Sequence, residues 1–352
     1  MFLPSNFNLK NLMMKKFLQV IMTCLVIVSF AQNKEIIKLK GSIPNNGEGD
    51  YSSLIVIDNR KDKTIGVLPF GDGKEMREVS FQNSPEDDLS EWYRRSNLKG
   101  GKQDLVLVLN DLKLSVKETY ERKNIGTMKF SLQSFLKEGG KYHFLYKKDT
   151  TFKFSHRDVA DAMVRNMHHL FSLYLEKTYK SKPSKYDLTL DDISNYQNYV
   201  NNYPAFKNET LKEGIYLDYN SFFRQTPEEG YALERWENGT LDRAVKTENG
   251  KKMKIPSRKM FIYVENGKAF KNTYSGFQEL LKNEKGFYIV AKPSSLFPPQ
   301  YDIRLGIMFG LAGGIADALL FNPNKLSHNP QEIYIDPMTG EYDFNDIFDE
   351  LP

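Results

Sequence analysis

The residue types best suited to acid–base or metal chemistry gather within residues 155–172. A helix over this stretch would place Asp161, His168 and His169 along one side, opposite an apolar stripe. A metal site needs three convergent ligands, and the spacing matches no familiar set such as His-Glu-x-x-His. We therefore favour a solvated helix face, and an unrecognised hydrolase site at Asp161 with His168 or His169 is the alternative.

Other catalytic signatures are absent from the sequence. No serine lies in Gly-x-Ser-x-Gly, and no segment matches a phosphate-binding Walker loop or a dinucleotide fingerprint. Adjacent acids such as Glu228-Glu229 do not place two carboxylates across a glycosidic bond. The acidic residues 343–350 lack the glycine and the ligand order of a calcium loop. We therefore expect no cofactor, no metal ion and no catalytic residues beyond the alternative above.

A second stretch, Leu305–Phe321, is apolar except for Asp317. Gly306, Gly310 and Gly314 recur every four residues, so a helix would carry a flat stripe that another helix or strand could approach closely. Three interpretations stay open: a helix buried between domains, a membrane-touching or oligomer-forming segment, and a glycine-rich loop. These three glycines and Asp317 are the candidate interaction residues, and any membrane contact is expected here.

The N-terminus predicts export. Two lysines precede an apolar run from Phe17 to Phe30, and Ser29-Phe30-Ala31 places small residues where a signal peptidase cuts. Because the run is too short to cross a bilayer comfortably, we expect residues 1–31 to be a signal peptide, with a retained membrane anchor as the alternative.

Composition narrows the class of protein further. Cys24, the only cysteine, lies in this signal, so a mature chain would have no disulfide, thiolate nucleophile or cysteine zinc site. Export without disulfides fits a bacterial envelope, and we expect the protein in the periplasm, at the outer membrane or outside the cell. The chain has 49 basic and 45 acidic residues, and signal removal takes away three lysines and no acid. This near-neutral balance gives no electrostatic reason to expect nucleic-acid binding, and no polybasic run indicates an anionic membrane surface.

The first half of the chain predicts strands with two helices. Short apolar or alternating stretches, including 105–109 and 112–116, predict a mostly antiparallel sheet. Ser84-Pro85 predicts the start of one helix, because a capping residue precedes a proline. Ser155 with Asp158 predicts the start of the other, whose apolar stripe should pack on the sheet.

Pro183 marks a boundary, because it stops any helix and stands in a lysine- and serine-rich linker. We therefore expect an α+β domain over residues 33–180 and a β-rich domain over residues 186–352. The second domain should begin with a helix from Leu190 to Val200 and continue as a β-meander, in which Asn266-Gly267 forms a tight hairpin turn.

Several strands of the second half carry a resemblance. Gly214-Ile-Tyr, the hairpin around Asn266-Gly267, Gly286-Phe-Tyr and the closing turn Asp336-Pro-Met-Thr-Gly340 resemble a pattern in uncharacterised secreted proteins of Bacteroidetes bacteria. The likeness covers roughly residues 211–345 and implies secretion and a β-rich fold, without an activity.

The first half is similar, in element order, to the small α/β domain of envelope lipoproteins and of auxiliary subunits of lipid transporters. This likeness centres on Ile57-Asp58-Asn59-Arg60 and Gly66 and implies an envelope role. We expect an exported α+β envelope protein that binds or scaffolds an unknown envelope protein or ligand, and no nucleic acid. The rivals are the hydrolase above and a membrane-associated assembly component that uses Leu305–Phe321.

Overall fold

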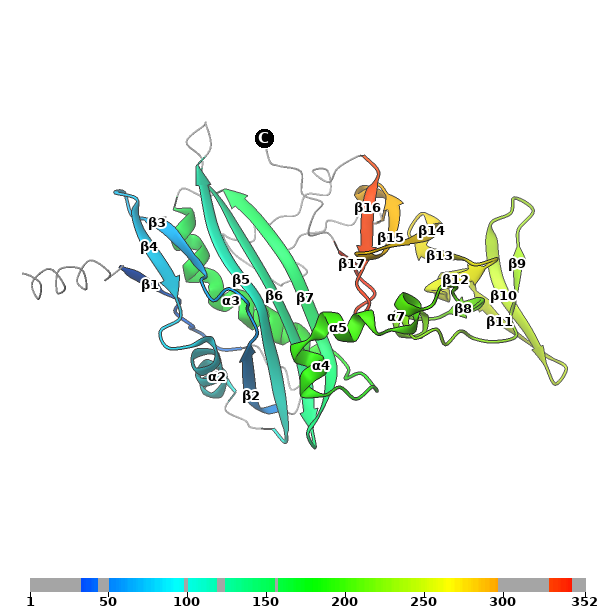
Figure 1. Ribbon diagram of the computed structural model, residues 1–352, viewed down its shortest axis with the longest axis horizontal. Helices are drawn as coiled ribbons and strands as arrows, with labels where there is room; N and C mark the ends of the chain where they lie inside the picture. The colour runs from blue at the N-terminus through cyan, green and yellow to red at the C-terminus, as the bar shows by residue number, and fades with distance from the viewer. Residues whose placement is uncertain are drawn as a thin grey trace, which may run out of the picture.

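The computed structural model describes residues 33–43, 51–97, 101–118, 124–155, 158–296 and 329–343. Its architecture is α+β, as predicted. The molecule is elongated, with a three-stranded sheet at each end and two larger sheets between them (Figure 1). No helix within these ranges has the length and apolar character that a membrane span requires. The predicted signal peptide and the glycine-rich segment lie outside the described residues.

Two sheets, rather than one, form the first half. The smaller has the order β1-β4-β3 and the larger the order β2-β5-β6-β7. Most described pairs are antiparallel, as predicted, but β1 with β4 and β2 with β5 are parallel. The strands are β1 (Lys34–Ile36), β2 (Tyr51–Asp58), β3 (Gly66–Phe70), β4 (Glu75–Ser80), β5 (Gln103–Glu118), β6 (Asn124–Glu138) and β7 (Lys141–Ser155).

The two apolar stretches expected as separate strands belong to the single strand β5. A bulge between Leu109 and Asp111 takes up the polar residues that separate them. Leu107 packs in the cluster under the helices, whereas Val106 packs in a second cluster on the opposite face of the sheet. Burial on both faces explains why this part of β5 is continuously apolar instead of alternating.

Helices α2 (Pro85–Ser96) and α3 (Val159–Lys180) pack on the first of these faces. Helix α2 begins as predicted, because the Ser84 side chain accepts a hydrogen bond from the N–H of Asp87 at 3.0 Å. Helix α3 begins later than predicted. Ser155 is the last residue of β7, where it pairs with Ile125. Strand pairing therefore extends β7 through the residue that the local sequence predicted as the helix cap.

The predicted helix from Leu190 to Val200 is two short helices that meet at Asn195. The backbone of Asn195 is not helical, with φ −115° and ψ 45°, so the chain changes direction there. The helices of this region are α4 (Leu190–Ser194), α5 (Tyr196–Asn201), α6 (Pro204–Lys207) and α7 (Tyr219–Phe223).

The remaining strands form the predicted meander and a separate small sheet. The seven-stranded sheet has the order β17-β16-β15-β14-β13-β12-β8, and β12 to β17 pair in sequence, each antiparallel to the next. The small sheet has the order β11-β10-β9. The elements are β8 (Gly214–Tyr216), β9 (Ala232–Arg235), β10 (Leu241–Glu248), β11 (Lys251–Pro256), η1 (Ser257–Lys259), β12 (Ile262–Glu265), β13 (Lys268–Thr273), β14 (Gly276–Asn283), β15 (Gly286–Ala291), η2 (Pro293–Leu296), β16 (Gln331–Ile335) and β17 (Tyr342–Asp343).

The hairpin between β12 and β13 turns at Asn266-Gly267, as predicted. Both residues have positive φ, 54° and 76°, which matches the turn geometry that joins two twisted strands. The carboxylate of Glu213 accepts hydrogen bonds from both turn amides, at 3.1 and 2.7 Å. Across the two strands of this hairpin, the rings of Tyr263 and Phe270 stack with their centres 4.8 Å apart.

The two halves share a buried cluster. The face of the four-stranded sheet that carries Val106 and Phe135 packs with second-half residues such as Phe222 and Ile289. Strand pairing across the proposed boundary consists, among the described residues, of one isolated bridge between Tyr142 and Leu188. Whether the halves fold separately on either side of Pro183 stays a prediction.

Candidate functional site

The predicted acid–base residues lie on α3, where the two histidines adjoin each other but Asp161 lies apart from them. The rings of His168 and His169 lie 4.0 Å apart, with His169 exposed and His168 half-buried. Burial and the neighbouring His169 lower the pKa of His168. Asp161 lies about two helical turns earlier, roughly 10 Å along the axis. Within the described residues, no three His, Cys, Asp or Glu side chains are placed to hold a metal ion.

The candidate interaction residues Gly306, Gly310, Gly314 and Asp317 lie outside the described residues. The geometry therefore neither supports nor opposes the three interpretations of that segment. The sites that follow were not indicated by the sequence patterns.

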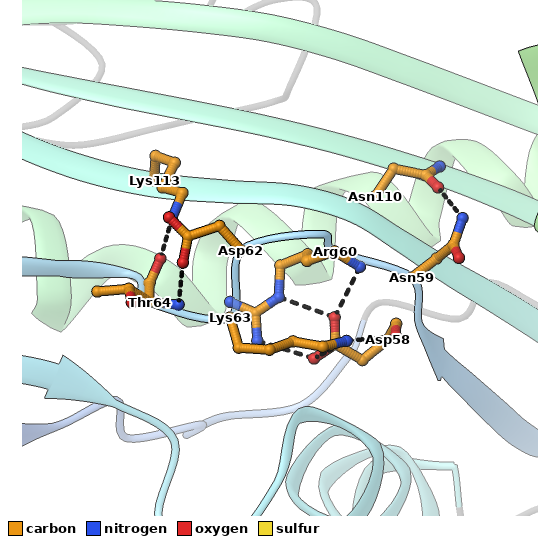
Figure 2. Close-up of polar contacts among 8 residues, drawn as sticks. All are labelled: Asp58, Asn59, Arg60, Asp62, Lys63, Thr64, Asn110 and Lys113. Atoms are coloured by element: carbon orange, nitrogen blue, oxygen red, sulfur yellow. Dashed lines mark hydrogen bonds and ion pairs between the residues drawn. The ribbon is translucent and has the colours of Figure 1, made fainter.

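A buried polar cluster lies at the carboxyl end of β2 (Figure 2). The Arg60 guanidinium donates from Nε and Nη2 to the two carboxylate oxygens of Asp58, at 2.8 and 2.9 Å. The side chains are 4% and 5% exposed. Burial by itself raises the pKa of Asp58, but the hydrogen bonds from Arg60 and Lys63 outweigh it, and the pKa lies below its usual value.

The loop that carries this pair is tied to β5. The Asn59 side-chain amide donates to Asn110, the bulged residue of β5, at 3.0 Å. Lys113, also on β5, pairs with Asp62 at 2.5 Å and donates to the Thr64 carbonyl. Figure 2 shows these contacts spread along the loop as it passes β5. The loop is therefore held at several points between the two first-half sheets.

This cluster is suited to structure rather than to chemistry. Among the described residues Arg60 Nη1 has no hydrogen-bond partner, and the atom is buried. The opposite charge of Asp58 already neutralises the guanidinium. The sequence signal, an Asp-x-Arg directly after an apolar strand, is too short to distinguish a buried pair from an exposed turn.

A second charged group joins the halves of the molecule. Lys147, on β7, places its ammonium 2.6 Å from Asp149 and 2.5 Å from Asp336, which begins the turn between β16 and β17. The lysine side chain is 12% exposed. Burial lowers its pKa, but the two carboxylates more than compensate and raise the pKa above the usual value. The Asp336 carboxylate also accepts hydrogen bonds from the N–H groups of Met338 and Thr339, so Lys147 is tied to an ordered turn.

Lys271, on β13, is a buried amine among aromatic rings. Its Nζ lies 4.2 Å from the ring centre of Phe261 and 5.6 Å from that of Tyr342, and it donates to the Asn272 carbonyl at 2.6 Å. The residue is 7% exposed. Burial lowers its pKa to about 8. Lys271 therefore packs against two aromatic rings and donates to a backbone carbonyl.

The β9–β11 sheet offers the most exposed aromatic side chain of the described residues. Trp236, in the turn between β9 and β10, is 60% exposed. Residues 251–259, which form β11 and η1, hold five exposed cations and no acid. The opposite face packs through Leu233, Ala244 and Ile255 in a small apolar cluster against the seven-stranded sheet. One face is thus used for attachment, and the opposite face, which carries the exposed Lys252 and Lys254, is termed the free face.

These sites differ in what they can do. The pairs at Arg60 and Lys147 fix loops and junctions, and Lys271 is enclosed by rings, whereas the β9–β11 sheet presents charge and an aromatic ring to solvent. Neither a protein-family model, nor a curated protein, nor a solved structure matches this chain.

Proposed function

We propose that this chain is an exported protein of the cell envelope that works by binding or scaffolding, with the β9–β11 sheet as its binding surface. The observation that carries the proposal is the contrast between the two faces of that sheet. Its inner face is buried around Ala244, while Trp236 and the cations of residues 251–259 face solvent. A partner that covers the exposed Trp236 ring would gain free energy from the apolar area it buries.

The β9–β11 sheet is firmly attached to the rest of the molecule, which supports its proposed role as a binding surface. Arg235 pairs with Glu265 of β12 at 2.5 Å and lies 5.8 Å from the ring centre of Tyr263. The seven-stranded sheet is tied in turn to the first half through Lys147 and Asp336. Binding surfaces on a fixed frame lose less conformational entropy when a partner docks.

The two rival functions receive less support. A hydrolase that uses Asp161 with His168 or His169 would need these groups to converge, and about two helical turns separate them. An assembly role for Leu305–Phe321 depends on residues outside the described ranges.

Cell fractionation with N-terminal sequencing tests the export half of the proposal. We expect the protein in envelope or secreted material, with a mature terminus within a few residues of Gln32. An intact Met1 or Met14 on soluble cytoplasmic protein would overturn export and with it the proposed function.

Crosslinking in cells tests the binding surface. A photoreactive phenylalanine analogue at Trp236 should give a discrete adduct with an envelope component. The matched control is the same analogue at Tyr274, which is equally exposed at 58% but lies in the turn between β13 and β14. Equal or absent adducts at the two positions would contradict binding through the β9–β11 sheet.

A further inference from the structure

We infer that the free face and the ends of the β9–β11 sheet dock on an anionic phospholipid surface. This inference rests on the proposed function and names its partner. It depends on a local excess of cations, on their distribution along the sheet and on an exposed tryptophan in the β9–β10 turn of the same sheet.

The excess of cations is confined to one stretch. Lys251, Lys252, Lys254, Arg258 and Lys259 are exposed, and no acid interrupts them. Among the described residues, Lys252 pairs with Glu234 at 3.2 Å, and no ion pair forms to the other four. The near-neutral balance of the whole chain conceals this excess. Unpaired cations keep their full attraction for a negatively charged surface.

The strand geometry spreads these cations over the sheet. Side chains alternate between faces, so Lys252 and Lys254 lie opposite the face that Ile255 buries. Lys251 adjoins the Asn249-Gly250 turn at one end of β11, and η1 follows at the other end. The sheet stands at one end of the molecule (Figure 1). A flat surface could therefore approach it without contact with the rest of the protein.

The exposed tryptophan selects among negatively charged partners. The Trp236 backbone is held in its turn, since its N–H donates to the Thr240 carbonyl at 2.9 Å and its carbonyl accepts from Gly239 at 2.8 Å. An indole ring is most favourable at the boundary between lipid headgroups and acyl chains. A nucleic acid offers the same negative charge, but the predicted export separates the mature chain from cytoplasmic nucleic acid. Cations and an exposed indole on the same small sheet therefore favour a bilayer surface.

Flotation with vesicles tests the charge. The purified mature chain should float with phosphatidylglycerol–phosphatidylcholine vesicles and not with phosphatidylcholine alone. The triple variant Lys251→Glu, Lys254→Glu, Lys259→Glu removes three cations that form no ion pair within the described part of the chain. Each lysine near an anionic surface contributes about fivefold in partitioning, so we expect a loss on the order of 100-fold or more.

A second triple variant controls for net charge. Lys61→Glu, Lys182→Glu and Lys207→Glu change the charge equally, at exposed lysines outside the β9–β11 sheet. This variant should keep nearly all of the vesicle affinity. Equal losses in the two triple variants, at unchanged melting temperature, would overturn the inference, because net charge alone would then explain binding.

Tryptophan fluorescence tests the docking geometry. The chain has two tryptophans, and Trp92 is buried at 2% exposure, so a change on vesicle addition reports Trp236. We expect a blue shift and quenching by brominated lipids, and both should vanish in Trp236→Phe. Unchanged emission would overturn the inference.

The remaining outcomes separate this inference from the proposed function. Equally tight binding to duplex DNA, with the same loss in the first triple variant, would identify a general polyanion surface and contradict a lipid partner. Absence of vesicle binding with a persistent protein adduct at Trp236 would overturn the lipid partner and leave the proposed function standing.

Discussion

The Arg60 guanidinium binds the carboxylate of Asp58, two positions earlier in the chain, through two hydrogen bonds, and both side chains are about 95% buried. This geometry lets a polar loop leave the end of a core strand without an unpaired carboxylate. A buried pair of this kind contributes little net free energy when intact, but it is costly to break from one side.

Replacement of Arg60 by methionine should lower the free energy of unfolding by about 3 kcal/mol, because the buried Asp58 carboxylate then keeps only its ion pair with the exposed Lys63. Denaturant unfolding followed by circular dichroism measures the change. Arg258→Met is the matched control: Arg258 is exposed and its loss should cost no more than about 0.5 kcal/mol. Similar midpoints for the two variants would contradict the structural role of the pair.

The same pair should make stability depend on acid. The pKa of Asp58 is lower in the folded than in the unfolded chain, so the carboxylate contributes stability above the usual carboxyl pKa of about 4. That contribution is lost as the pH falls through the lower folded pKa. The stability difference between the wild type and Asp58→Asn should therefore shrink below about pH 4. A stability difference between the wild type and Asp58→Asn that does not change with pH would contradict the lowered pKa of Asp58.

Gly66 should not tolerate alanine. A Cβ atom at this position would overlap the carbonyl oxygen of Leu114, whose N–H bonds the Ile65 carbonyl at 2.8 Å. Because backbone atoms must move, we expect Gly66→Ala to lower the free energy of unfolding by about 1–3 kcal/mol. Gly73→Ala, where a Cβ would meet open space, should change it by less than about 0.5 kcal/mol. Equal effects would show that the loop does not dock on β5 as described.

Lys147→Met should weaken the junction of the two halves. It leaves the carboxylates of Asp149 and Asp336 without their shared cation, and we expect a loss of about 3 kcal/mol in thermal or denaturant unfolding. Lys141→Met is the control on the same strand. Lys141 pairs with Asp187 at an exposed position, and such pairs contribute about 1 kcal/mol or less. A larger effect at Lys141 would contradict this assignment.

Protonated Lys271 should lower the free energy of unfolding, because its charge is buried in the folded state. Its pKa falls from 10.5 to about 8 on folding, so between these values the unfolded chain binds more protons and stability rises with pH. Below about pH 8 both states are protonated and the penalty is constant, on the order of 3 kcal/mol. Lys271→Met should therefore be more stable than the wild type at pH 7, with a gain that narrows from pH 8 to 10.5.

Unfolding midpoints of the wild type and Lys271→Met across pH 6–10.5 measure this effect. Lys268→Met, at an exposed lysine of the same strand that pairs with Glu279, should follow the wild type throughout. Parallel curves for the wild type and Lys271→Met would contradict the lowered pKa of Lys271.

Local sequence signals predicted elements whose physical cause is local. Ser84 with Pro85 specified the start of α2, and Asn266-Gly267 specified a hairpin turn, because each depends on backbone angles and hydrogen bonds within a few residues. The same signals failed at Ser155, where pairing with Ile125 of β6 extends β7 past the expected cap. A cap competes with a strand ladder, and the ladder depends on a partner distant in sequence.

By itself, the sequence determined the α+β class, the order of the meander and the apolar faces. These features depend on apolar periodicity and turn residues, which are properties of short stretches of sequence. Only the tertiary structure decided that Lys147 meets Asp336 across 189 positions, that Arg60 lies buried against Asp58, and that Lys271 lies between Phe261 and Tyr342. A charged residue in a sequence does not reveal whether it is desolvated. Its burial and partner are set by packing of distant elements, and these determine its contribution to stability and function.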